Sequence, residues 1–123
     1  MRDRMMEFFT RDASKRAELY LLYADKRISM AKMLADEKNW SLAESTAGKA
    51  EKYFLKLEES VTEAKSIGSA VDIGFFPRVR LSQIKHEQIL KTLLKQAPQE
   101  HKASFKDSLK LNSRFGNWAS EQK

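Results

Sequence analysis

The sequence is poor in the residues that make tight turns and covalent cross-links. Its 123 residues include no cysteine, four glycines and two prolines. Without cysteine, disulfide bonds and thiol catalysis are excluded. The scarcity of glycine and proline argues against a turn-rich all-β fold. The longest apolar run covers residues 19–24, far short of the roughly 20 residues that a membrane-spanning helix needs.

Motifs for catalysis and metal binding are also missing. The sequence has no glycine-rich phosphate loop and no serine nucleophile elbow. If a hairpin turns near Ala97, His86 and His101 are offset by roughly 10 Å along the helix axes, so they cannot share one ion. No glutamate stands three residues before either histidine, and Leu90 occupies the place of the second histidine of the zinc-protease motif. We therefore expect structural or surface histidines, with His86 at the core or its edge, no cofactor and no enzyme.

The chain does contain long helical patterns. Apolar residues make up 41% and charged residues 33% of the sequence, a balance typical of one folded helical domain, which we assign to 1–123. The clearest stripe recurs every three or four residues and consists of Ala43, Ala47, Ala50, Phe54, Leu57, Val61, Ala64 and Ile67. This spacing predicts a helix with one apolar face. We assign the residues between the stripe positions, Glu51 among them, to the wet face.

The same periodicity predicts the other elements. We expect a short helix at 3–9 and main helices over 13–38, 41–67, 78–96 and from Pro98 to Gly116. The predicted fold class is all-α: an antiparallel helical bundle of about four main helices, built as two packed helical hairpins. In the helix over 13–38, the apolar face is widened by Leu22, Tyr23, Met30 and Met33. This helix should therefore be the most buried.

Several residues predict where helices end or approach each other. Ser41 and Glu44 have capping-box spacing, which favours a helix start at Ser41. Gly68 can end that helix and Gly116 can end the last one. Gly48 lies inside a predicted helix, where glycine is costly, so it should mark a close approach between helices.

Positive charge is concentrated in the second half of the chain. The net charge is +6, and residues 61–123 contain 11 Lys/Arg against 6 Asp/Glu. Helical spacing places four cations in one ridge, with two more on the preceding helix: Lys102, Lys106, Lys110 and Arg114, with Lys91 and Lys95. The ridge either attracts nucleic acid, anionic lipid or an acidic cell-wall polymer, or is a solvated face partly balanced by acids. We favour the solvated face. Nucleic acid is the least favoured partner, because no stacking aromatic stands among the lysines.

Phe75 and Phe76 stand in the one long connector of the predicted fold. An exposed aromatic pair would be a candidate hydrophobic anchor for a partner. The alternative is that the connector folds back and plugs the end of the bundle. We favour the plug.

Two stretches resemble a bacterial all-helical domain family of unknown function. The first is residues 15–28, Lys-Arg-Ala-Glu-Leu-Tyr-Leu-Leu-Tyr-Ala-Asp-Lys-Arg-Ile, with Ala31 and Leu34 after it. The second runs from residues 85–90, Lys-His-Glu-Gln-Ile-Leu, to residues 97–100, Ala-Pro-Gln-Glu. The family's members are commonly exported or membrane-anchored, and no catalytic residue is established for them. The chain shows no signal peptide or anchor, so the resemblance implies a trimmed mature domain outside the cytoplasm.

Our leading hypothesis is a non-enzymatic, extracytoplasmic module with a binding or structural role at the cell surface. Its partner would be an unknown protein or an anionic surface polymer, and the chain would be a monomer or small homo-oligomer. The alternative is a cytoplasmic module that binds nucleic acid or an anionic surface through the basic ridge. An apolar ligand held inside the bundle is a third possibility.

Overall fold

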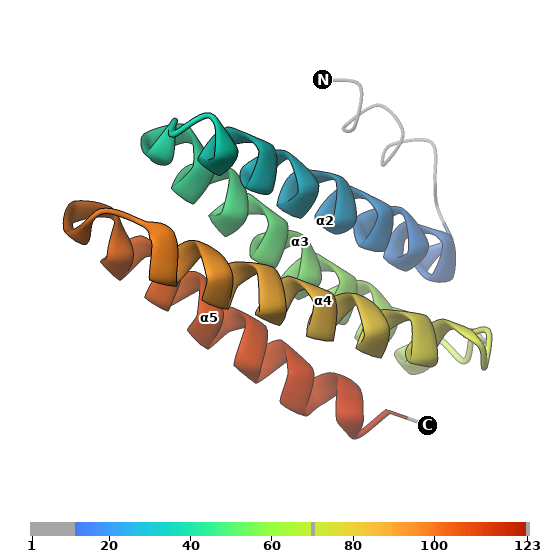
Figure 1. The fold of residues 1–123 in the computed structure, drawn as a ribbon. Coiled ribbons are helices and arrows are strands. Elements are labelled where there is room, and N and C mark those ends of the chain that lie inside the picture. Colours follow the sequence, from blue (N-terminus) through green and yellow to red (C-terminus); the bar gives the residue numbers. More distant parts are fainter. Residues whose placement is uncertain (1–11, 70, 123) are drawn as a thin grey trace.

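The computed structural model describes residues 12–69 and 71–122 and contains four helices in that range. They are α2 (Ala13–Asp36), α3 (Trp40–Ser66), α4 (Phe75–Gln96) and α5 (Gln99–Ser120), and no strand occurs among the described residues (Figure 1). The prediction of an all-α bundle is confirmed. The short helix predicted at 3–9 lies outside the described residues.

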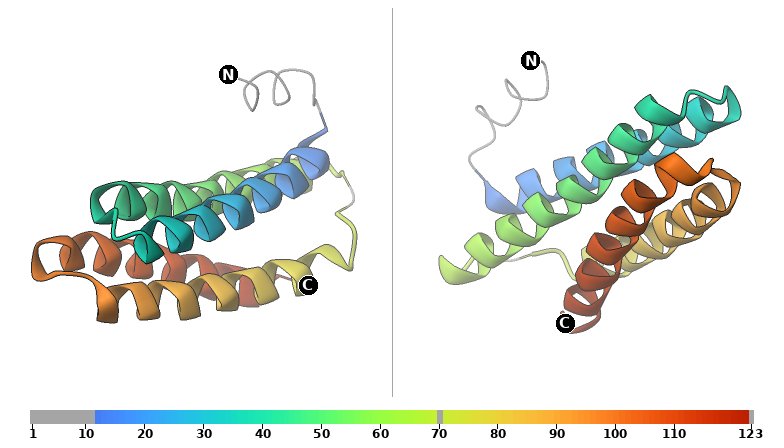
Figure 2. Two further views of the ribbon diagram at one scale, coloured as in Figure 1. Left: turned by 45° about the horizontal axis from the view of Figure 1, so that its top comes forward. Right: turned by 90° about the vertical axis from the view of Figure 1, so that its left-hand side faces the viewer.

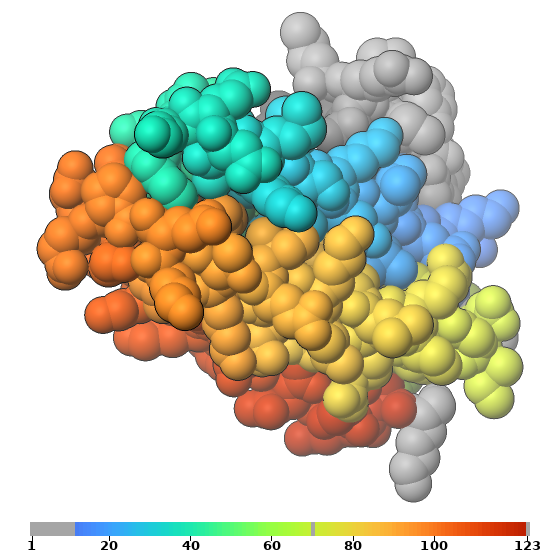
Figure 3. Space-filling model, viewed as in Figure 1, coloured from blue at the N-terminus to red at the C-terminus, as the bar shows by residue number. Residues whose placement is uncertain are grey.

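The helices form two antiparallel hairpins that stack as two layers. Helix α2 packs along α3, and α4 packs along α5. Between the layers, α3 lies on α5 and α2 lies on α4 (Figure 2). On one face of the molecule α4 therefore runs between α2 and α5 (Figure 3). This order explains how side chains of α4 can meet partners from α2, α3 and α5.

The core consists of two apolar clusters, one toward each end of the bundle. One cluster lies toward the α3–α4 connector and includes Phe54, Phe75, Val79 and Phe115. The rings of Phe54 and Phe115 stack with centroids 4.3 Å apart. The other cluster lies toward the two hairpin turns and includes Phe105. Between the two clusters the helices place polar side chains.

Alanine dominates the seam between α2 and α3. The alanines of α2 and α3 with no exposed surface are Ala17, Ala24, Ala31, Ala43, Ala47, Ala50 and Ala64. Because alanine adds little bulk, the two helices can pack closely along their length. Contacts with α3 and α4 cover only part of α2, which leaves Leu22, Met30 and Met33 exposed at 48%, 45% and 62%. The prediction that Leu22, Met30 and Met33 widen the buried face of α2 is therefore wrong, although Tyr23 is buried.

The turn between α2 and α3 is built by the backbone. Lys38 has φ 63°, and the amide of Asn39 donates to the carbonyl of Leu34 at 2.8 Å. Together these form a left-handed helix end that usually contains glycine. Helix α3 then starts at Trp40, and Asn39 makes no side-chain cap. The predicted start at Ser41 is one residue late, since the amide of Ala43 already donates to the carbonyl of Asn39.

The glycines have different roles from those predicted, except for Gly68. Gly68 has φ 73° and follows the end of α3, as predicted. Gly48 does not mark a close approach, because a Cβ there would meet only Ser108 Oγ at 3.9 Å. Gly116 does not end α5, which continues to Ser120. Gly116 is the close approach instead: a Cβ there would lie 2.8 Å from Cδ of Gln83.

Candidate functional site

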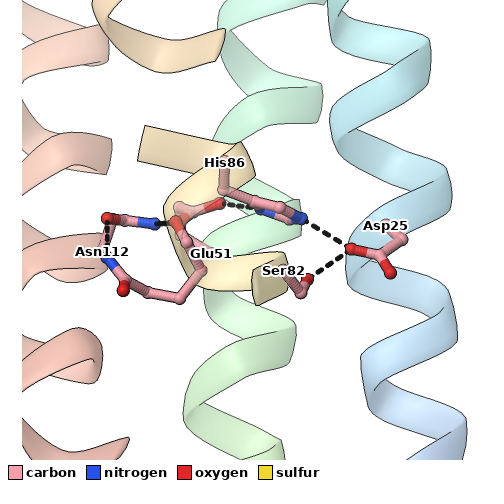
Figure 4. Close-up of polar contacts among 6 residues, drawn as sticks. Asp25, Glu51, Ser82, His86 and Asn112 are labelled. Carbon is pink, nitrogen blue, oxygen red and sulfur yellow. Dashed lines mark hydrogen bonds and ion pairs between the residues drawn. The ribbon is translucent and has the colours of Figure 1, made fainter. Parts of the chain in front are cut away.

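The most unusual feature of the bundle is a buried histidine between two carboxylates. His86 on α4 is fully buried, and its Nδ1 lies 2.8 Å from Oε2 of Glu51 on α3. Its Nε2 lies 3.0 Å from Oδ1 of Asp25 on α2. Asp25 also accepts a hydrogen bond from the hydroxyl of Ser82. Figure 4 shows these side chains meeting between the helices at mid-length.

The network continues from Glu51 to α5. The side-chain amide of Asn112 donates to Oε1 of Glu51 at 2.9 Å and to the carbonyl oxygen of Gln83 at 3.2 Å. In return, Nε2 of Gln83 donates to Oδ1 of Asn112 at 2.9 Å. Both oxygens of Glu51 therefore have donors, which explains how a carboxylate that is 1% exposed is tolerated in the core. One continuous set of hydrogen bonds joins all four helices.

The two carboxylates determine the charge of His86. A ring nitrogen can bond to an ionised carboxylate only by donating a proton, so two carboxylates favour the imidazolium form. Burial alone lowers the pKa of His86, but the hydrogen bonds and charges of Asp25 and Glu51 outweigh it and raise this pKa. Burial alone raises the pKa of Asp25, but the bonds from His86 and Ser82 outweigh it and lower this pKa. The centre is an ion pair within the fold.

This arrangement leaves neither ring nitrogen of His86 open to solvent. The imidazole has no solvent-exposed surface, and each nitrogen is occupied by a carboxylate. The carboxylates lie at opposite sides of the ring, so they do not converge on one ion. No group of three His, Asp or Glu side chains in 12–69 and 71–122 could hold a metal. His101 is far from this centre along the chain and binds Glu44 on α3 at 2.9 Å.

His86 lies in the core, as predicted, whereas the prediction that Glu51 lies on the solvent-exposed face is wrong, because Glu51 is buried. Asp25, Ser82 and Gln83 were not predicted as partners. Asn112 follows Phe105 by seven residues, which is the spacing of one helix face, but nothing in its own helix identifies Glu51 as the acceptor.

The predicted basic ridge is partly used by the fold itself. Lys102 donates from Nζ to the carbonyl oxygen of Leu94 at 2.6 Å, so it caps the C-terminal end of α4. Whether Lys102 also takes part in an anion-binding surface stays a prediction. Lys91 pairs with Glu87 at 3.5 Å across one helical turn. Two of the six candidate residues of the ridge therefore have partners within the fold.

The remaining cations of the ridge stay on the surface. The side chains of Lys95, Lys106 and Lys110 are exposed and make no ion pair or hydrogen bond with any residue of the described ranges. Arg114 is also exposed, and its charge lowers the pKa of Glu58 on α3, although burial outweighs this effect and raises that pKa. We call Lys95, Lys106, Lys110 and Arg114 the basic face. Asp107 is the acidic residue interspersed with it on α5.

Phe75 and Phe76 do not form an exposed anchor. They lie in the first turn of α4 and are only 1% and 7% exposed. Both belong to the apolar cluster near the α3–α4 connector, where Phe75 packs edge-on against Phe76 at 5.9 Å. The plug interpretation therefore fits the structure, and the helix starts three residues before the predicted Arg78.

None of the four described helices is long and apolar enough to span a membrane. Comparisons with protein-family models, curated proteins and solved structures find no match for this chain. The resemblance to a bacterial helical family thus stays a prediction.

Proposed function

We propose that this chain is a non-enzymatic binding module that presents the basic face of its α4–α5 hairpin to an anionic polymer at the cell surface. The observation that carries the proposal is the set of unpaired cations on that hairpin. Lys95, Lys106 and Lys110 extend into solvent without an acidic partner among the described residues. Like charges four residues apart repel each other slightly, so Lys106 and Lys110 do not contribute to the stability of α5.

Two features support a rigid scaffold for this surface. The buried network ties the α4–α5 hairpin to α2 and α3 through Asp25, Glu51 and Asn112. Lys102 also caps α4 from α5. A rigid helix presents its cations at fixed intervals of about 6 Å for each four residues, which suits a polymer with repeated charges.

The non-enzymatic part of the proposal is supported by the enclosure of His86. An imidazole with no exposed surface cannot exchange protons directly with a bound substrate. The extracytoplasmic part depends on the family resemblance of residues 15–28 and 85–100. Fractionation of the source cells with sequencing of the mature N-terminus tests it. Recovery of the protein from the cytoplasm would contradict it.

Binding of the intact chain to labelled polyphosphate and poly-L-glutamate, followed by fluorescence anisotropy over a range of salt concentrations, tests the interaction. The affinity should fall steeply with salt, because binding releases counterions. The double variant Lys106→Glu/Lys110→Glu should bind much more weakly, with a salt slope reduced by about 2. The matched control is Lys49→Glu/Lys52→Glu, which makes the same charge change at exposed positions of α3.

The control separates a specific face from net charge. Equal losses in both double variants would show that only the total charge matters and would overturn the proposal. Binding that does not depend on salt would do the same. Tighter binding to DNA or RNA oligonucleotides than to either polymer would replace the cell-surface proposal with the nucleic-acid alternative.

A further inference from the structure

A second polar feature lies outside the buried network, in the groove between α4 and α5. The groove has a volume of about 290 Å³ and a mainly polar lining. Helix α4 contributes Arg80, Gln83 and Glu87, and helix α5 contributes Ser113, Asn117 and Ser120. This volume is close to the lower end of ligand pockets, about 300 Å³, so the groove suits a small ligand.

Arg80 is the residue that the fold leaves unexplained. Its Nε is buried and has no hydrogen-bond partner, and the side chain makes no ion pair with any described residue. A buried donor without an acceptor normally has a structural or functional reason. Arg78, two residues away on the same helix, does have a partner, because it pairs with Glu18 on α2. The fold thus neutralises one arginine of α4 and leaves the other uncompensated.

The other side chains of the groove are placed to complement an oxyanion and not to neutralise the arginine. Glu87 is the acidic member of the lining, and it pairs with Lys91. Asn117 and Ser113 offer an exposed amide and an exposed hydroxyl on the opposite wall. Nε is enclosed, but the two terminal Nη groups are not among the buried atoms, and they can present parallel N–H groups to a carboxylate or phosphate, with the neutral donors nearby.

The floor of the groove is fixed by the buried network. Gln83 is 6% exposed and bonds Asn112 through Nε2, so its amide cannot swing freely. Gly116 makes room for it, because a Cβ at that position would lie 2.8 Å from Cδ of Gln83. The shape of the groove beside Arg80 is therefore fixed by the immobilised side chain of Gln83 and by the absence of a side chain at Gly116.

We propose that the groove between α4 and α5 binds a small oxyanion, either a carboxylate or a phosphate, on the guanidinium of Arg80. Asn117 and Ser113 donate to the same ligand from α5. This site is separate from the basic face. The site holds its ligand in a pocket through the planar guanidinium of an arginine, whereas the basic face attracts a polymer through separate charges. Its existence does not depend on the proposed polymer binding.

NMR titration of the ¹⁵N-labelled full chain with inorganic phosphate and with succinate, at constant ionic strength, tests the site. The Nε–H signal of Arg80 and the side-chain amide signals of Asn117 should shift and saturate with a Kd of about 1 mM, as expected of a small ligand with few contacts. The probe that saturates at the lower concentration identifies the class of oxyanion. Drift without saturation for both probes would overturn the proposal.

Four variants test whether binding is specific to this groove. Arg80→Gln should weaken binding at least tenfold, whereas the matched Arg78→Gln should leave it unchanged. Asn117→Ala should weaken binding severalfold while keeping Arg80, which gives an independent readout if the Arg80 variant is unstable. Binding that survives both Arg80→Gln and Asn117→Ala would refute the site. Retention in Lys106→Glu/Lys110→Glu would separate this site from the basic face, and its loss there would count against a separate site.

Discussion

Replacing Glu51 with leucine leaves the His86 imidazolium in the core with a carboxylate on only one ring nitrogen. The pair is fully buried on both sides, so water cannot take the place of the missing partner. Removal of one member of a buried ion pair costs about 3–5 kcal/mol. Leucine fills much of the vacated volume, and Asn112 keeps its bond to the carbonyl oxygen of Gln83. The cost should therefore arise mainly from the uncompensated charge.

The expected loss is large enough to measure in two ways. Unfolding entropy of about 2.1 cal/mol/K per residue gives roughly 0.26 kcal/mol/K for this chain, so the midpoint of thermal unfolding should fall by about 12–19 °C. Urea unfolding followed by circular dichroism at pH 6 should show the same loss in free energy of unfolding. Glu59→Leu changes an exposed glutamate of the same helix and should stay within about 0.5 kcal/mol of the parent.

The double variant His86→Leu/Glu51→Leu tests the cause. It removes both buried charges, and replacement of a buried pair by apolar residues is often close to neutral. The double variant should therefore be more stable than either single variant, with a coupling energy of about 2–3 kcal/mol. If Glu51→Leu is neutral, or if the two single losses simply add, the interpretation of the centre as a coupled ion pair is refuted.

Three further predictions concern pH and the backbone. The pKa of His86 is raised from 6.5, so its stabilisation should be complete below pH 6.5 and lost as pH rises through the folded pKa. The pKa of Asp25 is lowered from 3.8, so its stabilisation should be lost as pH falls below that value. Urea unfolding from pH 3 to 9 should show a plateau of stability between these limits, and the decline at alkaline pH should be absent in His86→Leu. Lys38→Gly should stabilise the chain by about 1 kcal/mol, since φ is 63° there; an unchanged or lower midpoint in thermal unfolding would contradict this. Gly48→Ala should stabilise α3 by up to about 1 kcal/mol. Gly116→Ala forces the buried amide of Gln83 to move, so this variant should be at least about 1 kcal/mol less stable than Gly48→Ala. Similar urea midpoints for the two variants would rule out the tight contact between Gly116 and Gln83.

The partners of His86 could have been found from the sequence by counting from a turn. Asp25 and Glu51 stand at equal distances on either side of Lys38, so an antiparallel hairpin brings them to the same level. Glu51 also follows Ala47 by four residues and precedes Phe54 by three, which is the spacing of the buried face. Its charge led to the opposite assignment. A histidine in a core series should prompt a search for an acid at its level.

Other features could not be predicted because they depend on how the hairpins meet. Lys102 looks like any exposed lysine until α4 ends beside it with free carbonyl groups. Gly116 has the sequence signature of a helix end, and only the contact with Gln83 explains why α5 continues through it. The exposure of Met33 follows from which sides of α2 are covered. The spacing of apolar residues shows which face of a helix is buried, but only the assembled bundle shows which helix packs against that face.

The polar layer between the two apolar clusters also limits how the hairpins can be aligned. Apolar side chains tolerate a range of offsets, and a shift by one helical turn would move α4 about 5.4 Å along its neighbours. Such a slipped alignment would carry His86 away from Asp25 and Glu51 and bury the charges of both histidine and glutamate among aliphatic groups. Ser82 would lose its bond to Asp25 and Asn112 its bond to Glu51 in the same step. The buried charges therefore fix the register of the two hairpins, which a uniformly apolar core of this length would not do.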